Sequence, residues 1–512
     1  MVFSSIVFLF FYLPAVLLIY HLIFLPVTLG MNQMLFRRLS NLFLLMVSLF
    51  FYFWGENFLL WIVIASTMID YICGMLISGG FKKGEIKPLE TNRKVTWLQR
   101  LGLVMSITSN LAFLGFFKYF NFGVDNFNSA LSMIGLENSL WLDAPQIILP
   151  LGISFYTFQS MSYTIDVFTG RVKATRNLVD FACYVTMFPQ LVAGPIVRYR
   201  DVAEQLVSRR VSIPLFASGV VRFVIGLGKK VLIANTVAVA ADQIFALPAG
   251  ELTLAVTWLG IVAYALQIYF DFSGYSDMAI GLGRMFGFRY LENFNFPYIA
   301  LSIQDFWRRW HISLSSWFRD YVYIPLGGSR KGNLRTYFNL VTVFFLCGLW
   351  HGASWSFVVW GLYHGAFLVA ERLGFGAWTR RLSLPLRHVY TLLVVLIGWV
   401  FFRADTLSYA LSYIRSMAGF GEGSGLVHNL SSFATPDLVI ALVAGIIGSA
   451  PIVAATNMRI DAACSKMAER KQRWVDLAFV EPTKVLLLSV IMLLSVMSLA
   501  SGTYNPFIYF RF

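Results

Sequence analysis

The chain has 512 residues, of which 58% are hydrophobic and only 13% are charged. A soluble domain carries about 25% charged residues, so this composition excludes a soluble enzyme and an intrinsically disordered protein. The 40 lysines and arginines outnumber the 26 acidic residues, giving a net charge of +14. In a membrane protein such an excess is typical of basic cytoplasmic loops, not of nucleic-acid binding. The four cysteines are scattered, and their spacing predicts neither a metal site nor a disulfide framework.

Apolar runs follow one another from the N-terminus onward. A spanning helix needs about 20 apolar residues, and we predict roughly ten to thirteen membrane segments, the shorter of which re-enter or tilt. The first run lacks a basic leader and a small-residue cleavage site, so we interpret it as a retained helix and not as a signal peptide. The runs cover residues 2–29, 41–53, 58–77, 101–120, 146–168, 181–197, 213–239, 252–272, 338–350, 354–370, 389–402, 438–455 and 485–499.

Basic residues gather in alternate loops and predict the orientation of the chain. Loops rich in lysine and arginine stay in the cytoplasm. Residues 121–143 contain three acids and no lysine or arginine, so we place this loop, the N-terminus and residues 421–436 outside. We expect one integral-membrane domain over residues 1–512, without a soluble domain or a repeat. The basic clusters are Arg37 and Arg38; Lys82, Lys83, Lys87, Arg93 and Lys94; Arg171, Lys173 and Arg176; Arg198, Arg200, Arg209 and Arg210; and residues 459–473.

Two carboxylates end the apolar run that begins at residue 252. Intramembrane carboxylates are costly and usually mark ion pairs or functional sites. The first interpretation is that Asp271 and Asp277 pair with Arg284 or Arg289 and fix helix packing. The second is that they belong to a functional site.

Residues 302–326 have the pattern of an amphipathic helix. Helical spacing puts a polar set on one face and an aromatic set on the other, which predicts a helix lying at the cytoplasmic interface, followed by a basic, glycine-rich turn. One interpretation is a simple interfacial anchor with snorkelling arginines. The other is a face that binds an anionic ligand, because histidine is an unusual anchor residue. The polar set is Arg308, His311, Ser315 and Arg319, and the aromatic set is Phe306, Trp310, Trp317 and Tyr321.

A further histidine ends the apolar run at residues 338–350. A lone histidine there is usually a satisfied structural residue, but the glycines at 348 and 352 predict a helix break, and irregular backbone at membrane depth favours a cavity. His351 is therefore a candidate functional residue. His364 would lie about 220° away around a continuous helix, so we interpret it as structural. The motifs of serine hydrolases, P-loop proteins, HExxH metalloproteases and dinucleotide-binding folds do not occur, which favours a membrane histidine acting without a protein serine.

Several stretches resemble the membrane-bound O-acyltransferase (MBOAT) superfamily, and within it the bacterial alginate O-acetylase branch. The resemblance extends over most of the chain and is most specific between residues 269 and 365. The matching stretches are MVFSSIVFLF at the start, LPLGISFYTFQ (149–159), FPQLVAGPIVRYRD (188–201), YFDFSGYSDMAIGLG (269–283), NFNFPYIALSIQDFWRRWHISLSSWFRDYVYIPLGGSRKG (293–332), GLWHGASW (348–355) and GWVFFRA (398–404).

The resemblance implies an all-α polytopic membrane protein, a ring of helices with re-entrant and interfacial segments around a central funnel, and a catalytic block at about residues 269–372. It implies that His351 is the catalytic histidine and His311 the second family-typical polar residue. The expected reaction moves an acetyl group from cytoplasmic acetyl-CoA, with no permanently bound cofactor, toward an alginate-like or cellulose-like exopolysaccharide. SGNH-like periplasmic proteins would be partners, and the location would be the bacterial inner membrane.

Residue chemistry adds a donor-site hypothesis. Arginine and lysine bind phosphate groups well, so Arg308, Arg319, Arg330 and Lys331 form a candidate cytoplasmic site for the phosphates of coenzyme A. Two alternatives stay open. One is transfer of D-alanine or another acyl group to a cell-wall polymer, and the other is a polysaccharide transporter without chemistry.

Overall fold

The computed structural model is helical, with no strand among the residues that it describes. Seven helical stretches of this part are long and apolar enough to cross a membrane: Phe8–Pro26, Met34–Ser78, Trp97–Met133, Ile213–Phe245, Leu254–Met285, Leu384–Arg403 and Ala478–Ala500. The predicted all-α polytopic architecture is thus confirmed. The described residues are 2–28, 33–81, 86, 88–90, 94–136, 141, 144–452, 455–456, 458, 476–502 and 504–506.

Some residues used in the sequence predictions lie outside the described part. They are Lys82, Lys83, Lys87 and Arg93 of one basic loop, Glu137 and Asp143 of the predicted outer loop, and the basic cluster at residues 459–473 with Cys464.

The N-terminal helices include one that is longer than predicted. Helix α4 continues to Met133, whereas the sequence pattern places a loop from residue 121. Polar side chains do not interrupt this helix, because Asn126 and Ser129 each donate a hydrogen bond to the carbonyl four residues earlier. The elements are η1 (Phe8–Tyr12), α1 (Leu13–Thr28), α2 (Gln33–Glu56), η2 (Asn57–Leu59), α3 (Leu60–Ser78), α4 (Trp97–Met133) and α5 (Ile153–Phe168).

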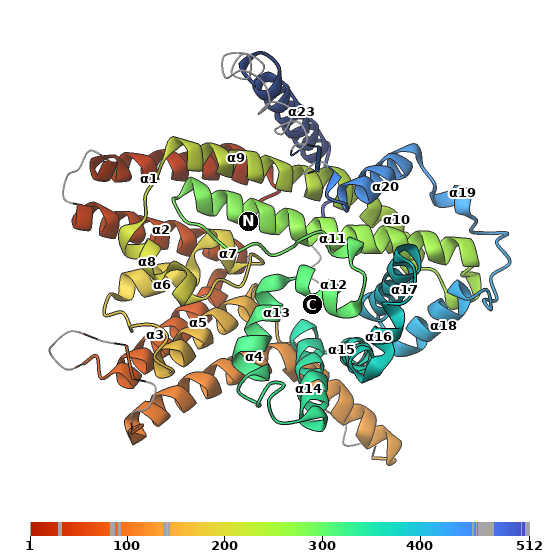
Figure 1. Ribbon diagram of the computed structural model, residues 1–512, viewed down its shortest axis with the longest axis horizontal. Helices are drawn as coiled ribbons and strands as arrows, with labels where there is room; N and C mark the ends of the chain where they lie inside the picture. The colour runs from red at the N-terminus through yellow and green to blue at the C-terminus, as the bar shows by residue number, and fades with distance from the viewer. Residues whose placement is uncertain are drawn as a thin grey trace.

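The middle of the chain contains a tight helix pair. Helices α9 and α11 run side by side in Figure 1. Glycines face each other across this pair, since a Cβ atom on Gly226 would lie 2.6 Å from the carbonyl oxygen of Gly274. Small residues allow such close backbone contact between membrane helices. The elements are α6 (Leu178–Thr186), α7 (Phe188–Leu191), α8 (Tyr199–Ser208), α9 (Ile213–Gly228), η4 (Lys229–Ala234), α10 (Asn235–Phe245), η5 (Ala249–Glu251) and α11 (Leu254–Met285).

The C-terminal half contains the short helices that build the centre. Helices α12 and α13 lie near the middle of Figure 1, with α9 and α11 on one side and α14 and α15 on the other. The elements are η6 (Pro297–Ile299), α12 (Ile303–Arg309), α13 (Ile312–Phe318), η7 (Arg319–Tyr323), α14 (Asn333–His351), α15 (Trp355–Ala370), η8 (Glu371–Phe375), α16 (Gly376–Thr379), α17 (Leu384–Arg403), α18 (Leu407–Met417), α19 (Leu430–Phe433), α20 (Pro436–Gly448), η9 (Asp476–Val480) and α23 (Glu481–Ala500).

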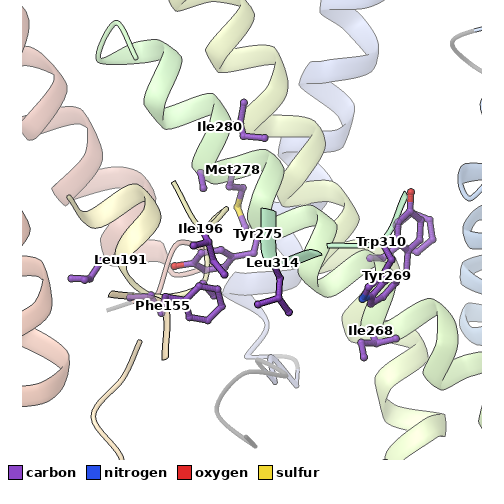
Figure 2. Packing of buried hydrophobic residues seen from close by; sticks show 14 of the residues in the cluster. Phe155, Leu191, Ile196, Ile268, Tyr269, Tyr275, Met278, Ile280, Trp310 and Leu314 are labelled. Carbon is purple, nitrogen blue, oxygen red and sulfur yellow. The ribbon is translucent and has the colours of Figure 1, made fainter. Parts of the chain in front are cut away.

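Aromatic and aliphatic side chains join these central helices into one core. Figure 2 shows Trp310, from the segment between α12 and α13, beside Tyr269 of α11, and their ring centres are 6.3 Å apart. On α13, the indole of Trp317 stacks on Phe158 of α5 at 3.7 Å. These contacts fix α12 and α13 against the surrounding helices, because large aromatic side chains bury much apolar area in one geometry.

The carboxylates of α11 form ion pairs, but not with the predicted partners. Asp277 pairs with Arg222 and Lys229 at 2.7 Å each. Asp271 pairs with Lys230 at 2.8 Å. The predicted pairing with Arg284 or Arg289 is wrong for both, because the packing of α9 and η4 on α11 brings basic residues from another helix to these carboxylates. The ion-pair interpretation itself is confirmed.

Candidate active site

His351 is the last residue of α14, and its backbone position follows from glycines. Gly352 is extended, with a φ of −166°, and ends the helix before α15 begins at Trp355. Helices α14 and α15 then fold back on each other in close contact, because any Cβ on Gly348 or Gly361 would clash with the carbonyl oxygens of Phe357 and Phe344 respectively. The predicted helix break at His351 is confirmed.

The imidazole of His351 lies in an aromatic box with one unsatisfied nitrogen. Its ring centre is 4.9 Å from that of Trp350, 5.0 Å from that of Trp360 and 5.1 Å from that of Phe402. The residue is 6% exposed, and its Nδ1 atom is buried without a hydrogen-bond partner among the described residues. Buried polar atoms are normally paired, so this unpaired nitrogen marks His351 as a candidate functional residue.

His311 lies elsewhere than the amphipathic pattern predicts. Helix α12 ends at Arg309, His311 adopts the left-handed conformation with a φ of 41°, and α13 begins at Ile312. The side chain is fully buried, not displayed on a basic interfacial face. The predicted continuous interfacial helix is therefore wrong. The aromatic residues around it pack inward against α5, α11 and α17 and turn the segment into part of the core.

Hydrogen bonds determine the tautomer of His311. The Oδ1 atom of Asn293 accepts a hydrogen bond from the backbone N–H of Ser313, so it is an oxygen and accepts a hydrogen bond from Nδ1 of His311 at 3.1 Å as well. Asn293 donates in turn to Ser276 of α11. The proton of the neutral ring is thus held on Nδ1, and Nε2 is a buried acceptor without a partner in the described chain.

Trp350 connects the two histidines. Its ring centre lies 6.0 Å from that of His311 and 4.9 Å from that of His351. The structure therefore brings together both histidines that the sequence singled out. His364 lies nearby, buried beside Trp360 and Trp307. The prediction that His364 faces away from His351 assumed one continuous helix, and the break after His351 removes that assumption.

A small cavity of about 130 Å³ opens directly on His351. Its polar lining includes Glu56, Lys118 and Ser154, and Trp350 forms part of its wall. A cavity of this size holds a few water molecules or a small acyl group. A second cavity of about 320 Å³ shares Lys118 with it and is lined by the residues that follow His351, including Ser354. The small cavity is the one that His351 itself lines, and the second cavity adjoins it at Lys118 and Leu149.

A basic cavity of about 420 Å³ lies between α12, α13 and α14. Arg308, Arg319 and Cys347 line it, and so does Trp307, whose ring contacts Trp360 of the His351 box at 5.7 Å. None of its lining residues is shared with the small cavity at His351. The indole of Trp307 therefore links the lining of the basic cavity to the aromatic box around His351.

Further arginines extend this basic region. An adjoining cavity of about 400 Å³ shares Gln304, Leu340 and Leu368 with the first one. Glu371 lines it, but its carboxylate accepts hydrogen bonds from the backbone N–H groups of Ile303 and Gln304. The adjoining cavity is also lined by Arg372, Arg380 and Arg387, which the sequence analysis did not single out.

The four predicted donor-site cations do not all gather at the basic cavity of about 420 Å³ between α12, α13 and α14. Arg308 and Arg319 line it, whereas Arg330 and Lys331 are exposed on the turn before α14 and line none of the four cavities described above. Arg319 also donates to the carboxylate of Asp320 at 2.8 Å. Burial opposes ionisation of Asp320, but hydrogen bonds from Arg319 and Arg200 hold its pKa below the ordinary value.

Two residues at the site were missed by the sequence analysis. Lys118 lies on α4 and contacts the end of α14, and Asn293 orients His311. A lone lysine within an apolar run was a signal that could have found Lys118, because such residues are costly at membrane depth and usually functional. Asn293 had no comparable local signal.

Comparison with known proteins agrees with the motifs. The model of the membrane-bound O-acyltransferase family matches residues 143–412. The probable alginate O-acetylase of Pseudomonas putida is 42% identical over the whole of both chains, and that of Pseudomonas aeruginosa is 41% identical over the whole of both chains. The peptidoglycan O-acetyltransferase of Helicobacter pylori is 36% identical, covering 76% of this chain and 75% of its own.

Proposed function

The chain belongs to the membrane-bound O-acyltransferase family and is a membrane-bound O-acetyltransferase, and we propose that it passes an acetyl group from cytoplasmic acetyl-CoA toward an exopolysaccharide on the outer side. The observation that carries the proposal is His351, a buried histidine at a helix break with an unsatisfied nitrogen and a cavity beside it. The names of the relatives support an O-acetyl transfer with an alginate-like or peptidoglycan-like polymer as candidate acceptor. A cellulose-like polymer is a further candidate.

In the proposed reaction His351 is the general base. It takes the proton from an acceptor hydroxyl, whose oxygen attacks the thioester carbonyl of acetyl-CoA, and the proton then passes to the departing thiolate, so that an ester and free coenzyme A form. Indole N–H groups are candidate donors to the oxyanion, since the Nε1 atoms of Trp307 and Trp360 are buried and have no partner among the described residues. His311 assists through its unprotonated Nε2, close to Trp350.

On the donor side, the basic cavity is the proposed site for coenzyme A. Its guanidinium groups suit phosphate oxygens, and its apolar wall leads toward the His351 box through Trp307. Arg308 and Arg319 would bind the nucleotide directly. Arg330 and Lys331, on the exposed turn before α14, would meet it during entry.

Reversing the charge of both arginines of the basic cavity, in the double variant Arg308→Glu and Arg319→Glu, should raise the KM for acetyl-CoA about tenfold or more. The physical reason is the loss of charge-assisted hydrogen bonds to the phosphate groups. The value of kcat and the binding of protein partners should change little. Steady-state kinetics on purified protein in lipid nanodiscs measures this. The matched control is Arg289→Glu, an exposed arginine that lines none of the cavities. An unchanged KM in the double variant would remove these residues from the donor site.

We also propose a location in the bacterial inner membrane with the N-terminus in the periplasm, supported by the alternation of basic loops. Ser329 is exposed on the basic turn that this orientation places in the cytoplasm. In a variant whose four native cysteines are replaced by serine, Ser329→Cys should react with an impermeant thiol reagent only after the cells are opened. Labelling in intact spheroplasts would invert the topology and contradict the cytoplasmic donor site.

On the acceptor side, SGNH-like periplasmic proteins are the proposed partners that carry the acetyl group to the polymer. Membranes containing the protein should consume acetyl-CoA in the presence of the correct glycan, and assays with alginate, cellulose and peptidoglycan would identify it. If D-alanine is transferred from a carrier protein and acetyl is not transferred from acetyl-CoA, the acyl-donor proposal fails. If no acyl group is transferred but polymer crosses the membrane, the transporter alternative is correct.

A further inference from the structure

A charged residue without an assigned role lies directly beside His351. Lys118 is on α4, far from α14 in sequence, and its ammonium group donates hydrogen bonds to the backbone carbonyls of Trp350 and of His351, the latter at 2.9 Å. The next residue, Tyr119, donates through its hydroxyl to the carbonyl of Leu349. Two neighbouring side chains of one helix therefore hold three consecutive carbonyls at the end of another.

These carbonyls require partners from outside their own helix. The last four C=O groups of a helix have no intrahelical donor, and cations near them are favourable because the helix dipole is negative at this end. Helix α14 cannot continue past His351, since Gly352 is extended. Water or a distant side chain must supply the donors, and here Lys118 and Tyr119 supply them.

The location of Lys118 gives this contact a role beyond capping. It lines both cavities beside His351, the small one with Ser154 and the larger one with Ser354. Among the described residues the hydrogen-bond partners of Lys118 are uncharged oxygens, although an ammonium group at membrane depth is costly. A charged group at such a cost is normally kept for function. Lys118 donates to the backbone carbonyls of the candidate catalytic residue and of Trp350 and, at 3.5 Å, to the hydroxyl of Ser154.

We propose that Lys118 is a positioning residue that, together with Tyr119, fixes the end of α14 and thereby the imidazole of His351. The proposal rests on the proposed role of His351 in acetyl transfer. It does not make Lys118 a proton donor or a ligand of the substrate. A misplacement of a reacting group by about 1 Å can lower a rate about 100-fold. Loss of the contacts that Lys118 makes with the end of α14 should therefore lower kcat.

The first test compares Lys118→Met with Lys118→Arg in purified protein. The methionine variant should lower kcat about 10- to 100-fold with the KM for acetyl-CoA nearly unchanged, and the arginine variant should recover much of it. The matched control is Lys229→Met, which also removes a partly buried ammonium but leaves Asp277 paired with Arg222. A normal kcat in Lys118→Met would overturn the proposal.

The second test measures how firmly the end of α14 is fixed, and its result does not depend on the acyl donor. Hydrogen–deuterium exchange at residues 347–354 should be faster in Lys118→Met than in the wild type, normal in Lys118→Arg and normal in Lys229→Met. Unchanged exchange in Lys118→Met would overturn the proposal. If the wild type transfers no acetyl group from acetyl-CoA, the proposed function fails, and this exchange result still decides whether Lys118 fixes the end of α14.

Should Lys118→Met not accumulate, chemical rescue provides the answer. In a variant without the four native cysteines, Lys118→Cys should have low activity, and alkylation with 2-bromoethylamine should restore it by rebuilding an amine of similar length. Tyr119→Phe should give a smaller fall in kcat with the same KM. Full activity in both unmodified variants, or failure of the rebuilt amine to restore activity in folded protein, would overturn the proposal.

Discussion

Replacing His351 with alanine should abolish acetyl transfer while the chain still inserts and accumulates. A positioned general base contributes about 10²- to 10⁴-fold to a rate, and the ring also fills the box of Trp350, Trp360 and Phe402. Removing it leaves space near the small cavity, but the glycines at the break and the α14–α15 contact stay in place. The measurement is acetyl incorporation into polymer, divided by the amount of folded protein in the membrane.

The matched control for this variant is His388→Gln. His388 is on α17, and its Nδ1 lies 3.3 Å from the carbonyl of Ala300, outside the box of His351. It should leave acetylation unchanged. Retained polymer acetylation in His351→Ala would show that another group acts as the base.

Replacing His311 with alanine should lower the rate strongly, about 100-fold, with the KM for the donor less affected. The ring has its proton held on Nδ1 by Asn293, so that Nε2 remains an acceptor beside Trp350. Its backbone has a φ of 41°, which alanine tolerates poorly and asparagine tolerates well. His311→Asn should therefore retain more activity than His311→Ala, because it keeps the backbone conformation and changes only the side chain.

A variant of Asn293 tests whether the orientation and tautomer of the His311 ring matter, and not only its presence. Asn293→Ala removes the acceptor that holds the proton on Nδ1, so it should lower the rate while leaving His311 present. Rates per folded molecule and melting temperatures would be measured for all three variants. A normal rate in His311→Ala would mean that this histidine only fills the core.

The helices and the break at His351 follow from local sequence. A long apolar run is helical wherever it crosses a bilayer, because every backbone N–H and C=O must be satisfied within the segment. Gly348 and Gly352 mark close packing and a chain reversal without reference to any distant residue. For these reasons the all-α class and the position of His351 could be predicted, and the family motifs pointed to the same residue.

The end of α4 and the structure and burial of residues 302–326 could not be predicted from local sequence. A polar stretch can continue as helix when its side chains bond the preceding turn, as Asn126 does. An amphipathic pattern describes a continuous helix, but the segment breaks at His311, whose ring contacts Asn293, Phe272 of α11 and Trp350 of α14. Burial by distant helices outweighs the local pattern there.

The pairing of charges was decided by tertiary structure alone. The sequence contains Asp277 and several basic residues, and only the packing of α9 on α11 selects Arg222 and Lys229 as its partners. Lys118 likewise reaches the end of α14 only because α4 passes beside it. Periodicity along one helix records which face is buried, whereas the partner of a polar group depends on which helices meet. The sequence by itself therefore determined the helical membrane architecture and the candidate catalytic histidine, and the fold decided what holds that histidine in place.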